Sequence, residues 1–492
     1  MITAAQKSIR DKKLARLSAG ASPRALEICS GCGGLSLGLK EAGFELTAHI
    51  EIDAGAATSY ALNFGRERTK DDPWALPRNM ETCTATQLTS ELGLGSASDS
   101  FDLLAAGLPC QAFARIGRSK LREVSGGNDD AFRKDPRAAL YRRFLKYVED
   151  TQPLIILIEN VPDILNFGAH NVPEEICETL EHAGYRTGYT LLNAAYYGVP
   201  QFRERLFIVA IADVLGQEPH FPEPTRFLDL PRGYEGARRV ALKHVDRESG
   251  RFHEIREPTR SLPRAVGVRE ALNDLPFIRE HVSAPHVIRR RKLGELLPYR
   301  HNDLSDYTKA MRSWKGFETT DGADGHLVRL TPRDFPIFAR MEHGADYPQA
   351  RELAERMFEE EVAKQGLSKR AAAWKQLYAS MVPPYDPKKF PNKWWKLDPL
   401  RPSRTLTAHM GKDTYSHIHY DGRQCRTVSV REAARLQSFP DGFRFAGAMN
   451  AAFKQIGNAV PPLLGLAVAR SLKQQIEKAL APAEKADGRQ AA

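Results

Sequence analysis

The sequence lacks an apolar stretch long enough to cross a lipid bilayer, which takes ~20 consecutive apolar residues. Its apolar runs are short, and a run such as Leu154–Ile158 fits a buried strand. The N-terminus mixes basic residues such as Lys7, Arg10 and Lys13 with polar ones and has no apolar signal core, so we expect a solvated amphipathic helix there. From these absences we expect a cytoplasmic protein that does not associate with membranes.

Cysteine is also scarce, with six residues in the chain: Cys29, Cys32, Cys83, Cys110, Cys177 and Cys425. Their pattern does not resemble a disulfide framework, which favours a reducing compartment. Cys29 and Cys32 have the C-x-x-C spacing of zinc and redox sites. No second pair follows them, and the spacing spans a glycine turn. We therefore expect small buried residues at both positions and no metal site.

The composition that remains is ordinary for a globular protein, with 42% hydrophobic and 27% charged residues. A chain of 492 residues exceeds the roughly 250–300 that one core supports, so we expect two lobes or more. The formal net charge of +10 has the sign that suits a polyanionic partner, although many proteins of this size carry such a charge.

Strand and helix patterns alternate in the first part of the chain, which predicts an α/β, mostly parallel, doubly wound sheet. The expected strands are Ala25–Ile28, Leu46–Asp53, Phe101–Ala106, Leu154–Glu159 and Leu206–Ile211. The expected helices among them lie around Leu140–Val148 and Pro173–His182.

This alternation ends near Asp213 and is followed by a region rich in Arg, Lys, Pro and His up to about Leu400. Helices are expected there at Ala350–Lys364 and Lys369–Tyr378. Regular patterns then return, with helices expected at Val428–Leu436 and Pro461–Ala479. The order predicts a catalytic lobe in two parts, 1–278 and 397–480, separated by an inserted domain at 279–396 and followed by a frayed tail at 481–492.

A glycine turn joins the first expected strand to a helix, and Glu51 ends the next strand. The turn, Cys29-Ser30-Gly31-Cys32-Gly33-Gly34, lacks the G-x-G-x-x-G spacing that binds a diphosphate, but its glycines permit a ligand close to the backbone. An acid at the position of Glu51 grips ribose hydroxyls in nucleotide-binding units. Together they favour an adenosyl cofactor without a diphosphate.

Cys110 follows Pro109 directly after the strand Phe101–Ala106, at the sheet edge where α/β proteins bind ligands. A cysteine there suits a nucleophile, since its thiolate is highly reactive. The alternative for a lone cysteine is a small buried hydrophobe.

Charged residues mark the edges of two further strands. Glu159 closes an apolar strand, where it would either act as an acid or form a structural ion pair. Arg203 and Arg205 alternate before the strand Leu206–Ile211, so both point to one face if extended. Such a pair could bind phosphate or polarise a carbonyl oxygen of a base.

Taken together, these segments resemble the cytosine-C5 DNA methyltransferase family of prokaryotic restriction-modification systems. The resemblance covers about Ala25–Ala212 and Leu397–Leu472, and its parts are specific only in combination. The matching stretches are Cys29–Leu39, Gly107–Phe113, Asp135–Tyr141, Glu159–Val161, Tyr197–Arg205, Arg401–Thr407, Val428–Pro440 and Gln455–Pro462.

The resemblance implies a Rossmann-like methyltransferase fold and S-adenosyl-L-methionine as cofactor. Methylating C5 of cytosine requires a thiolate at C6, an acid at N3 and a donor at O2. These roles fall to Cys110, Glu159 and Arg205, with Arg203 supporting and Asn160 orienting the acidic segment. The expected cofactor residues are Cys29, Ser30, Gly31, Cys32, Gly33, Gly34, Glu51, Ile52, Leu108, Pro109, Leu140, Asn458 and Ala459.

The expected partner is double-stranded DNA, from which the target base must be flipped out. A basic, glycine-containing segment after the nucleophile is expected to close over the DNA, the alternative being a solvated loop. The insert occupies the place of the family's target-recognition domain and interleaves basic residues with aromatics. The expected DNA contacts are Gln111, Arg115, Arg118, Lys120, Arg137, Arg289, Arg290, Arg291 and Lys393.

Two positions depart from the family pattern: Cys29 stands where an aromatic commonly flanks the adenine, and only Glu81 offers an acid after the third strand. The alternatives are a tRNA cytosine-C5 methyltransferase and a non-catalytic DNA-binding protein on the same scaffold; the long basic insert favours DNA. We further expect a monomer that protects host DNA beside a restriction or anti-phage system.

Overall fold

The computed structural model describes residues 2–109, 136–166, 171–230, 234–411 and 415–481. In these residues a six-stranded sheet has the order β2-β1-β3-β4-β6-β5, and all adjacent strands up to β4 are parallel, while β6 runs antiparallel to both its neighbours. This confirms the predicted mostly parallel sheet. The strands are β1 (Arg24–Ile28), β2 (Glu45–Ile50), β3 (Leu103–Ala106), β4 (Ile155–Asn160), β5 (Tyr185–Asn193) and β6 (Glu204–Ala212).

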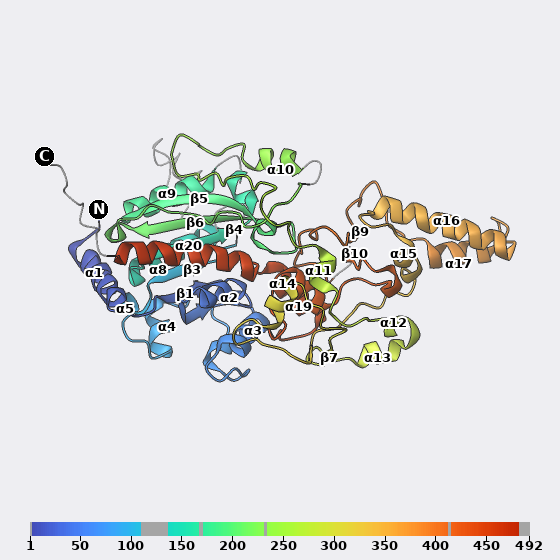
Figure 1. The fold of residues 1–492 in the computed structure, drawn as a ribbon, viewed down its shortest axis with the longest axis horizontal. Helices are drawn as coiled ribbons and strands as arrows, with labels where there is room; N and C mark the ends of the chain where they lie inside the picture. The colour runs from blue at the N-terminus through green and yellow to red at the C-terminus, as the bar shows by residue number, and fades with distance from the viewer. Residues whose placement is uncertain (1, 110–135, 167–170, 231–233, 412–414, 482–492) are drawn as a thin grey trace.

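Helices cover both faces of this sheet (Figure 1). On one face α2 packs against α20, although these helices are far apart in the sequence. On the other face α4 and α5 contact α8, and α9 packs against β5. The bounds are α2 (Gly34–Glu41), α3 (Ala54–Phe64), α4 (Ala85–Glu91), α5 (Ala97–Ser100), α8 (Pro136–Thr151), α9 (Val172–His182), α10 (Tyr234–Ala241) and α20 (Pro462–Leu480).

The strand register brings the carboxyl ends of β1, β2, β3 and β4 together at one edge of the sheet, which we call the active edge. Ile28 of β1 pairs with Ile50 of β2 and with Ala106 of β3, so these parallel strands end at one edge. Because β6 is antiparallel to β4, its first residues lie at the same edge as the end of β4, where Asn160 pairs with Leu206. Ligands of open α/β sheets bind at this edge.

Two differences from the expected elements have physical causes. The strand expected to reach Asp53 ends at Ile50, because the Asp53 side chain accepts a hydrogen bond from Ala56 N and caps α3. Strand β5 was missed, because Gly188 interrupts its apolar pattern. A Cβ at Gly188 would lie 2.6 Å from the His253 ring, so this glycine permits a close approach.

The N-terminal helix α1 (Ala4–Ser18) exists as expected but is not simply solvated. Arg10 and Lys13 are buried, and Lys13 Nζ donates to the carbonyls of Phe101, Thr151 and Gln152. Lys7 is exposed as expected, whereas Arg10 and Lys13 donate to carbonyls at the ends of other elements.

A second body of structure extends away from the sheet and ends in the hairpin of α16 and α17, giving the molecule its elongated shape (Figure 1). The short strands in this part pair as β9 with β10 and β7 with β8. The elements are α11 (Val268–Leu272), α12 (Glu280–Ser283), α13 (Pro285–Arg290), β7 (Leu297–Pro298), α14 (Asp306–Arg312), β8 (Gly322–Ala323), α15 (Phe335–Arg340), α16 (Tyr347–Gln365), α17 (Ala372–Met381), β9 (Trp394–Lys396), β10 (Tyr415–Ile418), α18 (Val430–Leu436) and α19 (Met449–Asn458).

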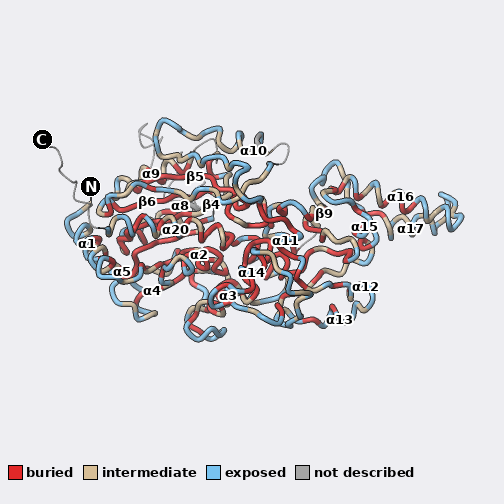
Figure 2. Tube along the Cα trace, in the orientation of Figure 1, coloured by how far each residue is buried: buried red, intermediate tan, exposed pale blue. Residues whose placement is uncertain are grey.

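Three main hydrophobic clusters form the interior, and burial is greatest in and around the sheet (Figure 2). The first fills the sheet lobe, and the second joins Leu37 of α2 to residues near α11, α14, α18 and α19. The third holds Phe338, Tyr347 and Trp394 together with Ile418. The expected insert 279–396 therefore shares its hydrophobic packing with the rest of the chain. Its helix α14 packs with the second cluster, and Ile418 from beyond the insert packs with the third.

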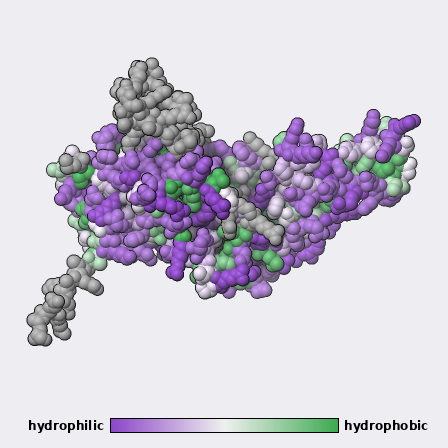
Figure 3. Space-filling view, turned by 90° about the horizontal axis from the view of Figure 1, so that it is seen from above, coloured by the Kyte–Doolittle hydropathy of each residue, from purple (hydrophilic) through white to green (hydrophobic). Residues whose placement is uncertain are grey.

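The surface carries no dominant apolar face in the view of Figure 3, where hydrophilic residues cover most of the area and hydrophobic ones form separate patches. Within the part of the chain that the structure describes, no helix is both long and apolar enough to span a membrane.

Candidate active site

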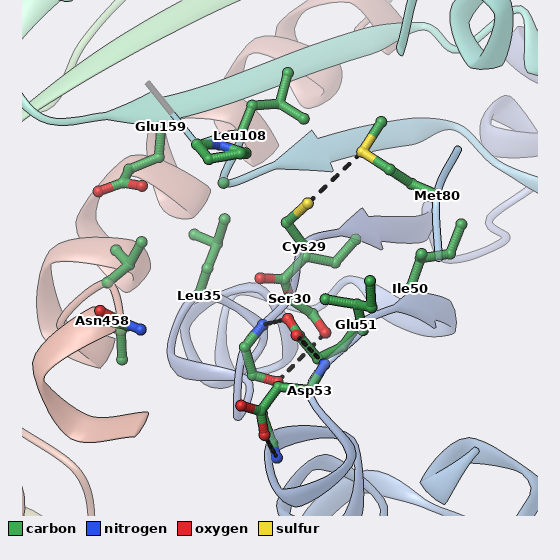
Figure 4. Close-up of a pocket in the computed structure, with 18 of the residues that line it drawn as sticks. Cys29, Ser30, Leu35, Ile50, Glu51, Asp53, Met80, Leu108, Glu159 and Asn458 are labelled. Atoms are coloured by element: carbon green, nitrogen blue, oxygen red, sulfur yellow. Dashed lines mark hydrogen bonds between the residues drawn. The ribbon is translucent and has the colours of Figure 1, made fainter. Parts of the chain in front are cut away.

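A cavity of about 730 Å³ opens at the active edge of the sheet (Figure 4). Its walls come from the ends of β1, β2, β3 and β4, the segment after β2, and the end of α19. Ligand pockets of roughly 300–1,000 Å³ hold small molecules of cofactor size. Ten of the expected cofactor residues line it: Cys29, Ser30, Gly31, Glu51, Ile52, Leu108, Pro109, Leu140, Asn458 and Ala459.

Glu51 is fixed by two backbone amides. Gly31 N donates to one carboxylate oxygen at 2.8 Å and Asp53 N donates to the other at 2.7 Å. Burial raises the pKa of Glu51, while these amide hydrogen bonds oppose that rise. Each oxygen keeps a second lone pair, so the carboxylate can accept from ribose hydroxyls while it stays in place.

The other three residues of the glycine turn do not line the cavity, although all six were expected at the cofactor. Cys32 is buried with its thiol near the Gln455 carbonyl. Gly33 has a φ of 95°, and a Cβ there would lie 2.3 Å from the Phe64 ring. A Cβ on Gly34 would lie 2.3 Å from Val460 O, so these glycines permit helix packing rather than ligand approach.

Two sulfur atoms form one wall of the cavity. Cys29 Sγ lies 3.7 Å from Met80 Sδ, and Figure 4 shows both side chains beside Leu108. Burial raises the pKa of the Cys29 thiol to about 12, so it stays neutral and acts as a small hydrophobe. Ile52, 66% exposed, is an apolar side chain at the rim. Met80 was not expected, because its segment has no strand or helix pattern.

Glu159 and Arg205 form an ion pair at the opposite side of the cavity. Arg205 Nε lies 2.8 Å from Glu159 Oε1, and the side chains are only 11% and 12% exposed. Burial raises the pKa of Glu159, and the nearby Arg205 and then Arg203 act against that rise. Both residues line the cavity, as expected for groups that contact a bound base.

Arg203 has a different environment from Arg205. It is buried and does not line the cavity. Its guanidinium donates to Leu406 O at 2.7 Å, Gly457 O at 2.8 Å and Ala459 O at 3.2 Å. Arg203 therefore joins β6 to the C-terminal segment that carries Asn458.

Asn160 holds the backbone that leads to the expected nucleophile. Its amide donates to Leu108 O at 2.9 Å, and its Oδ1 accepts from Val161 N at 2.9 Å. Pro109 lines the cavity and directly precedes Cys110 in the chain. The positions expected at Cys110, Gln111, Arg115, Arg118 and Lys120, and the side chain of Arg137, lie outside the described residues.

The basic residues expected to contact DNA from the insert divide into two kinds. Arg289 and Arg290 are exposed at the end of α13. Arg291 is buried instead, with its side chain 3% exposed and paired with Glu280 at 3.1 Å. Lys393 Nζ lies 3.6 Å from the centre of the Tyr385 ring, a cation–π contact that leaves it half-exposed.

Sequence reasoning missed several polar residues of the cavity, among them Glu27 and Lys454. Glu27 of β1 is buried, and burial raises its pKa to about 8. The alternation of β1 gave no reason to expect a carboxyl among its buried side chains. Lys454 of α19 reaches the cavity and pairs with Asp53. Its spacing of four from Asn458 could have suggested the same helix face.

Among the residues described, no three His, Cys, Asp or Glu side chains gather as metal ligands would.

The chain is similar to known proteins over most of its length. The family model of C-5 cytosine-specific DNA methylases matches residues 24–474. M.OihORF3336P of Oceanobacillus iheyensis is 36% identical over 476 residues, which cover 95% of this chain and 97% of that protein.

The type II methyltransferase M.AgeI of Thalassovita gelatinovora is 31% identical over 473 residues, 92% of this chain and all of that protein. A solved E. coli structure, described as a DNA modification methyltransferase encoded within a prophage, covers 93% of this chain with a TM-score of 0.55 and 21% identity. At that identity the likeness concerns the fold alone.

Proposed function

Because this chain belongs to the C-5 cytosine-specific DNA methylase family, we propose that it methylates C5 of a flipped-out cytosine within a specific duplex DNA sequence. S-adenosyl-L-methionine is the proposed methyl donor, and Cys110 forms a covalent bond to C6 of the base. The chain is thus a DNA methyltransferase whose target sequence is set by the inserted lobe.

The observation that carries this proposal is the Glu159–Arg205 ion pair. It faces the same cavity as Glu51 and the glycine turn. It also adjoins Leu108 and Pro109, from which the chain continues to Cys110. One cavity therefore contains the groups proposed for the cofactor and for the base, next to the proposed nucleophile.

The residues present fit the proposed cofactor. Glu51 is oriented by Gly31 N and Asp53 N to accept from ribose hydroxyls. The wall of Cys29, Ile52 and Met80 is apolar, which suits the faces of an adenine ring. When bound, S-adenosyl-L-methionine supplies an electrophilic methyl group.

At the base, the Cys110 thiolate adds to C6 and the ring electrons move toward N3 and C5. Glu159 stabilises the developing charge by sharing a proton with N3, and its buried position raises the pKa in the sense this role needs. Arg205 donates to O2 while it keeps Glu159 oriented. Methyl transfer leaves S-adenosylhomocysteine. Solvent water then accepts the C5 proton, and the thiolate is expelled as the C5–C6 double bond re-forms.

Duplex DNA is the proposed substrate because the insert carries cations at its surface. Arg289, Arg290 and Lys393 are the proposed phosphate contacts among the described residues. Gln111, Arg115, Arg118, Lys120 and Arg137 are proposed to contact DNA from the segment after the nucleophile. The proposed setting is host DNA protection beside a restriction or anti-phage partner, with the enzyme acting as a monomer in the cytoplasm.

The decisive experiment incubates the protein with methyl-labelled S-adenosyl-L-methionine and either duplex DNA or tRNA, and maps 5-methylcytosine by bisulfite sequencing. Label in duplex DNA at one recurring sequence is expected. Label in tRNA alone would replace the proposal with an RNA methyltransferase. No label in either would leave a non-catalytic DNA-binding protein.

The covalent step has its own test, which uses duplex DNA with 5-fluorocytosine at the mapped position. Fluorine cannot leave as the C5 proton does, so the protein–DNA adduct should persist in denaturing gels. Cys110→Ala is the matched control and should form no adduct. A Cys110→Ala protein that still methylates would overturn the assignment of the nucleophile.

A further inference from the structure

Lys454 is a cavity residue that the proposed reaction does not yet use. It lies on α19 one turn before Asn458, so both side chains share a helix face. Its Nζ lies 2.7 Å from Asp53 Oδ2, and both residues line the cavity. The lysine side chain is 56% exposed and that of Asp53 is 40% exposed. The amine is therefore accessible to a ligand in the cavity.

The cavity has an excess of acidic side chains. Among the described lining residues, five are carboxylic acids: Glu27, Glu51, Asp53, Glu81 and Glu159. Three are basic: Arg78, Arg205 and Lys454. An anionic group of a ligand would be repelled by these acids, and a cation of the lining would give it a stronger, charge-assisted contact than the neutral donors there.

Two of the three cations have largely buried side chains that are already paired: that of Arg205 is 11% exposed and that of Arg78 is 7% exposed. Arg205 pairs with Glu159 at 2.8 Å. Arg78 pairs with Glu91 at 3.1 Å and donates to Pro73 O at 3.2 Å. Lys454 is paired as well, but its side chain is the most exposed of the three, and its partner Asp53 is a half-exposed carboxylate that water can solvate.

The proposed methyl donor carries both signs of charge at its methionine end. Its sulfonium and ammonium groups suit a cavity rich in carboxylates. A cation would give its carboxylate a charge-assisted contact. We infer that Lys454 binds the carboxylate of the methionine portion of S-adenosyl-L-methionine, an assignment that rests on the proposed function.

The exchange of partners that this requires is inexpensive. An exposed lysine–aspartate pair contributes roughly 0–1 kcal/mol. Asp53 Oδ1 still accepts from Ala56 N at 3.1 Å, so the aspartate keeps its role as the N-cap of α3 when Lys454 turns to the ligand. Lys454 can therefore bind the cofactor without loss of local structure.

The test measures binding to the full-length protein, without DNA, by titration calorimetry. The two ligands are S-adenosyl-L-methionine and its decarboxylated analogue, which lacks only the carboxylate. A charge-assisted contact predicts that the wild type binds the intact cofactor about tenfold more tightly than the analogue. In Lys454→Met this preference should fall to about twofold or less, through weaker binding of the intact cofactor alone.

Two further variants sharpen the result. Lys478→Met removes a charge from an exposed face of α20 and should keep the wild-type preference. Asp53→Asn preserves an N-cap and should also keep it, since Lys454 remains. A preference unchanged in Lys454→Met, or lost equally in Asp53→Asn, would overturn the inference. Failure of the wild type to bind either ligand would instead count against the proposed function.

Discussion

Glu159 lies where burial and a neighbouring guanidinium act on its pKa in opposite directions. The sequence left two roles open for this residue, an acid or a structural ion pair. In the structure the two roles are compatible, because the ion pair of Glu159 with Arg205 faces the cavity rather than the protein interior. A carboxyl oriented in this way is suited to sharing a proton with a base.

Replacing Glu159 by glutamine tests this role. Glutamine keeps an acceptor for Arg205 but cannot share a proton, so single-turnover methylation should slow by about 100-fold or more. Binding of duplex DNA and of S-adenosyl-L-methionine should stay within about twofold of the wild type. A methylation rate within about fivefold of the wild type would exclude proton sharing by Glu159.

Glu27 makes a prediction about pH and stability. Burial raises its pKa from 4.5 to about 8, with Glu51 and Glu159 adding to the rise and Ser36 opposing it. Between these pH values the folded protein holds a proton that the unfolded chain has lost. As the pH rises through this range, the free energy of unfolding should therefore fall by about 1.4 kcal/mol per pH unit because of this group.

Urea denaturation of the wild type and Glu27→Gln at pH 5, 6, 7 and 8 measures this contribution. The variant lacks the titration, so its stability relative to the wild type should rise with pH across this window and level off above pH 8. A constant difference between the two proteins would show that Glu27 keeps an ordinary pKa.

Arg291 and its neighbours show the limit of sequence inference at this scale. Arg289, Arg290 and Arg291 are identical in type and adjacent, and all three were expected at DNA. Only the fold distinguishes them, because the turn after α13 directs Arg291 toward Glu280 and buries it. Charge alone does not tell an exposed arginine from a buried, paired one.

Among the elements, β6 begins between two arginines that occupy different environments, Arg203 just before the strand and Arg205 within it. Its antiparallel direction places its first residues at the active edge, which brings Arg205 to Glu159. Arg203, two residues earlier, is buried against the C-terminal segment. The sequence predicted the alternation but not the separate environments, because the partners of Arg203 lie beyond the insert.

The variant Arg203→Met should destabilise the protein by about 3 kcal/mol or more, since the carbonyls of Leu406, Gly457 and Ala459 lose their donor in a buried site. Chemical denaturation measures this loss, and Arg203→Lys should recover part of it. In Arg203→Lys the affinity for S-adenosyl-L-methionine should fall more than the rate at saturating cofactor. A stable Arg203→Met protein with a lowered rate would instead favour direct action on the base.

Much of the central sheet could be predicted, because buried strands and amphipathic helices carry strong local patterns. Strands β1, β3, β4 and β6 and helices α8, α9 and α20 lie within a few residues of their expected positions. Strand β5 could not be found in this way, since Gly188 is explained only by the distant His253. The burial of Lys13 likewise depends on carbonyls more than eighty residues away in the chain.

For the molecule as a whole, the insert shares its packing with the lobe that it interrupts. Arg435 of α18 pairs with Asp274 and Asp441, and Arg312 of α14 also pairs with Asp274. These buried ion pairs join Asp274, near the end of the first part of the lobe, both to Arg312 of the insert and to the C-terminal part. A boundary at 279 or 396 is therefore a division of the sequence rather than of the packing.

The exposed arginines at the end of α13 predict how DNA binding responds to salt. Neutralising phosphates releases counterions, so affinity should fall steeply as salt rises. The double variant Arg289→Gln/Arg290→Gln should reduce the slope of log K against log salt by about 2. Arg186→Gln is the matched control, because Arg186 lies near the start of β5, at the opposite edge of the sheet. Equal slopes in all three proteins would exclude Arg289 and Arg290 as phosphate contacts.

The packing of α2 against α20 also has a consequence for the order in which the protein is made. The cavity needs Asn458 and Ala459, about 250 residues after β6. At a ribosomal rate of 5–20 residues per second, roughly 12–50 s separate synthesis of the sheet from synthesis of its missing wall. During that interval the apolar side of α2, including Leu35, has no α20 to cover it. Translation itself therefore delays completion of the cavity, and the nascent sheet passes through a period of exposure in which chaperones would have their opportunity to act.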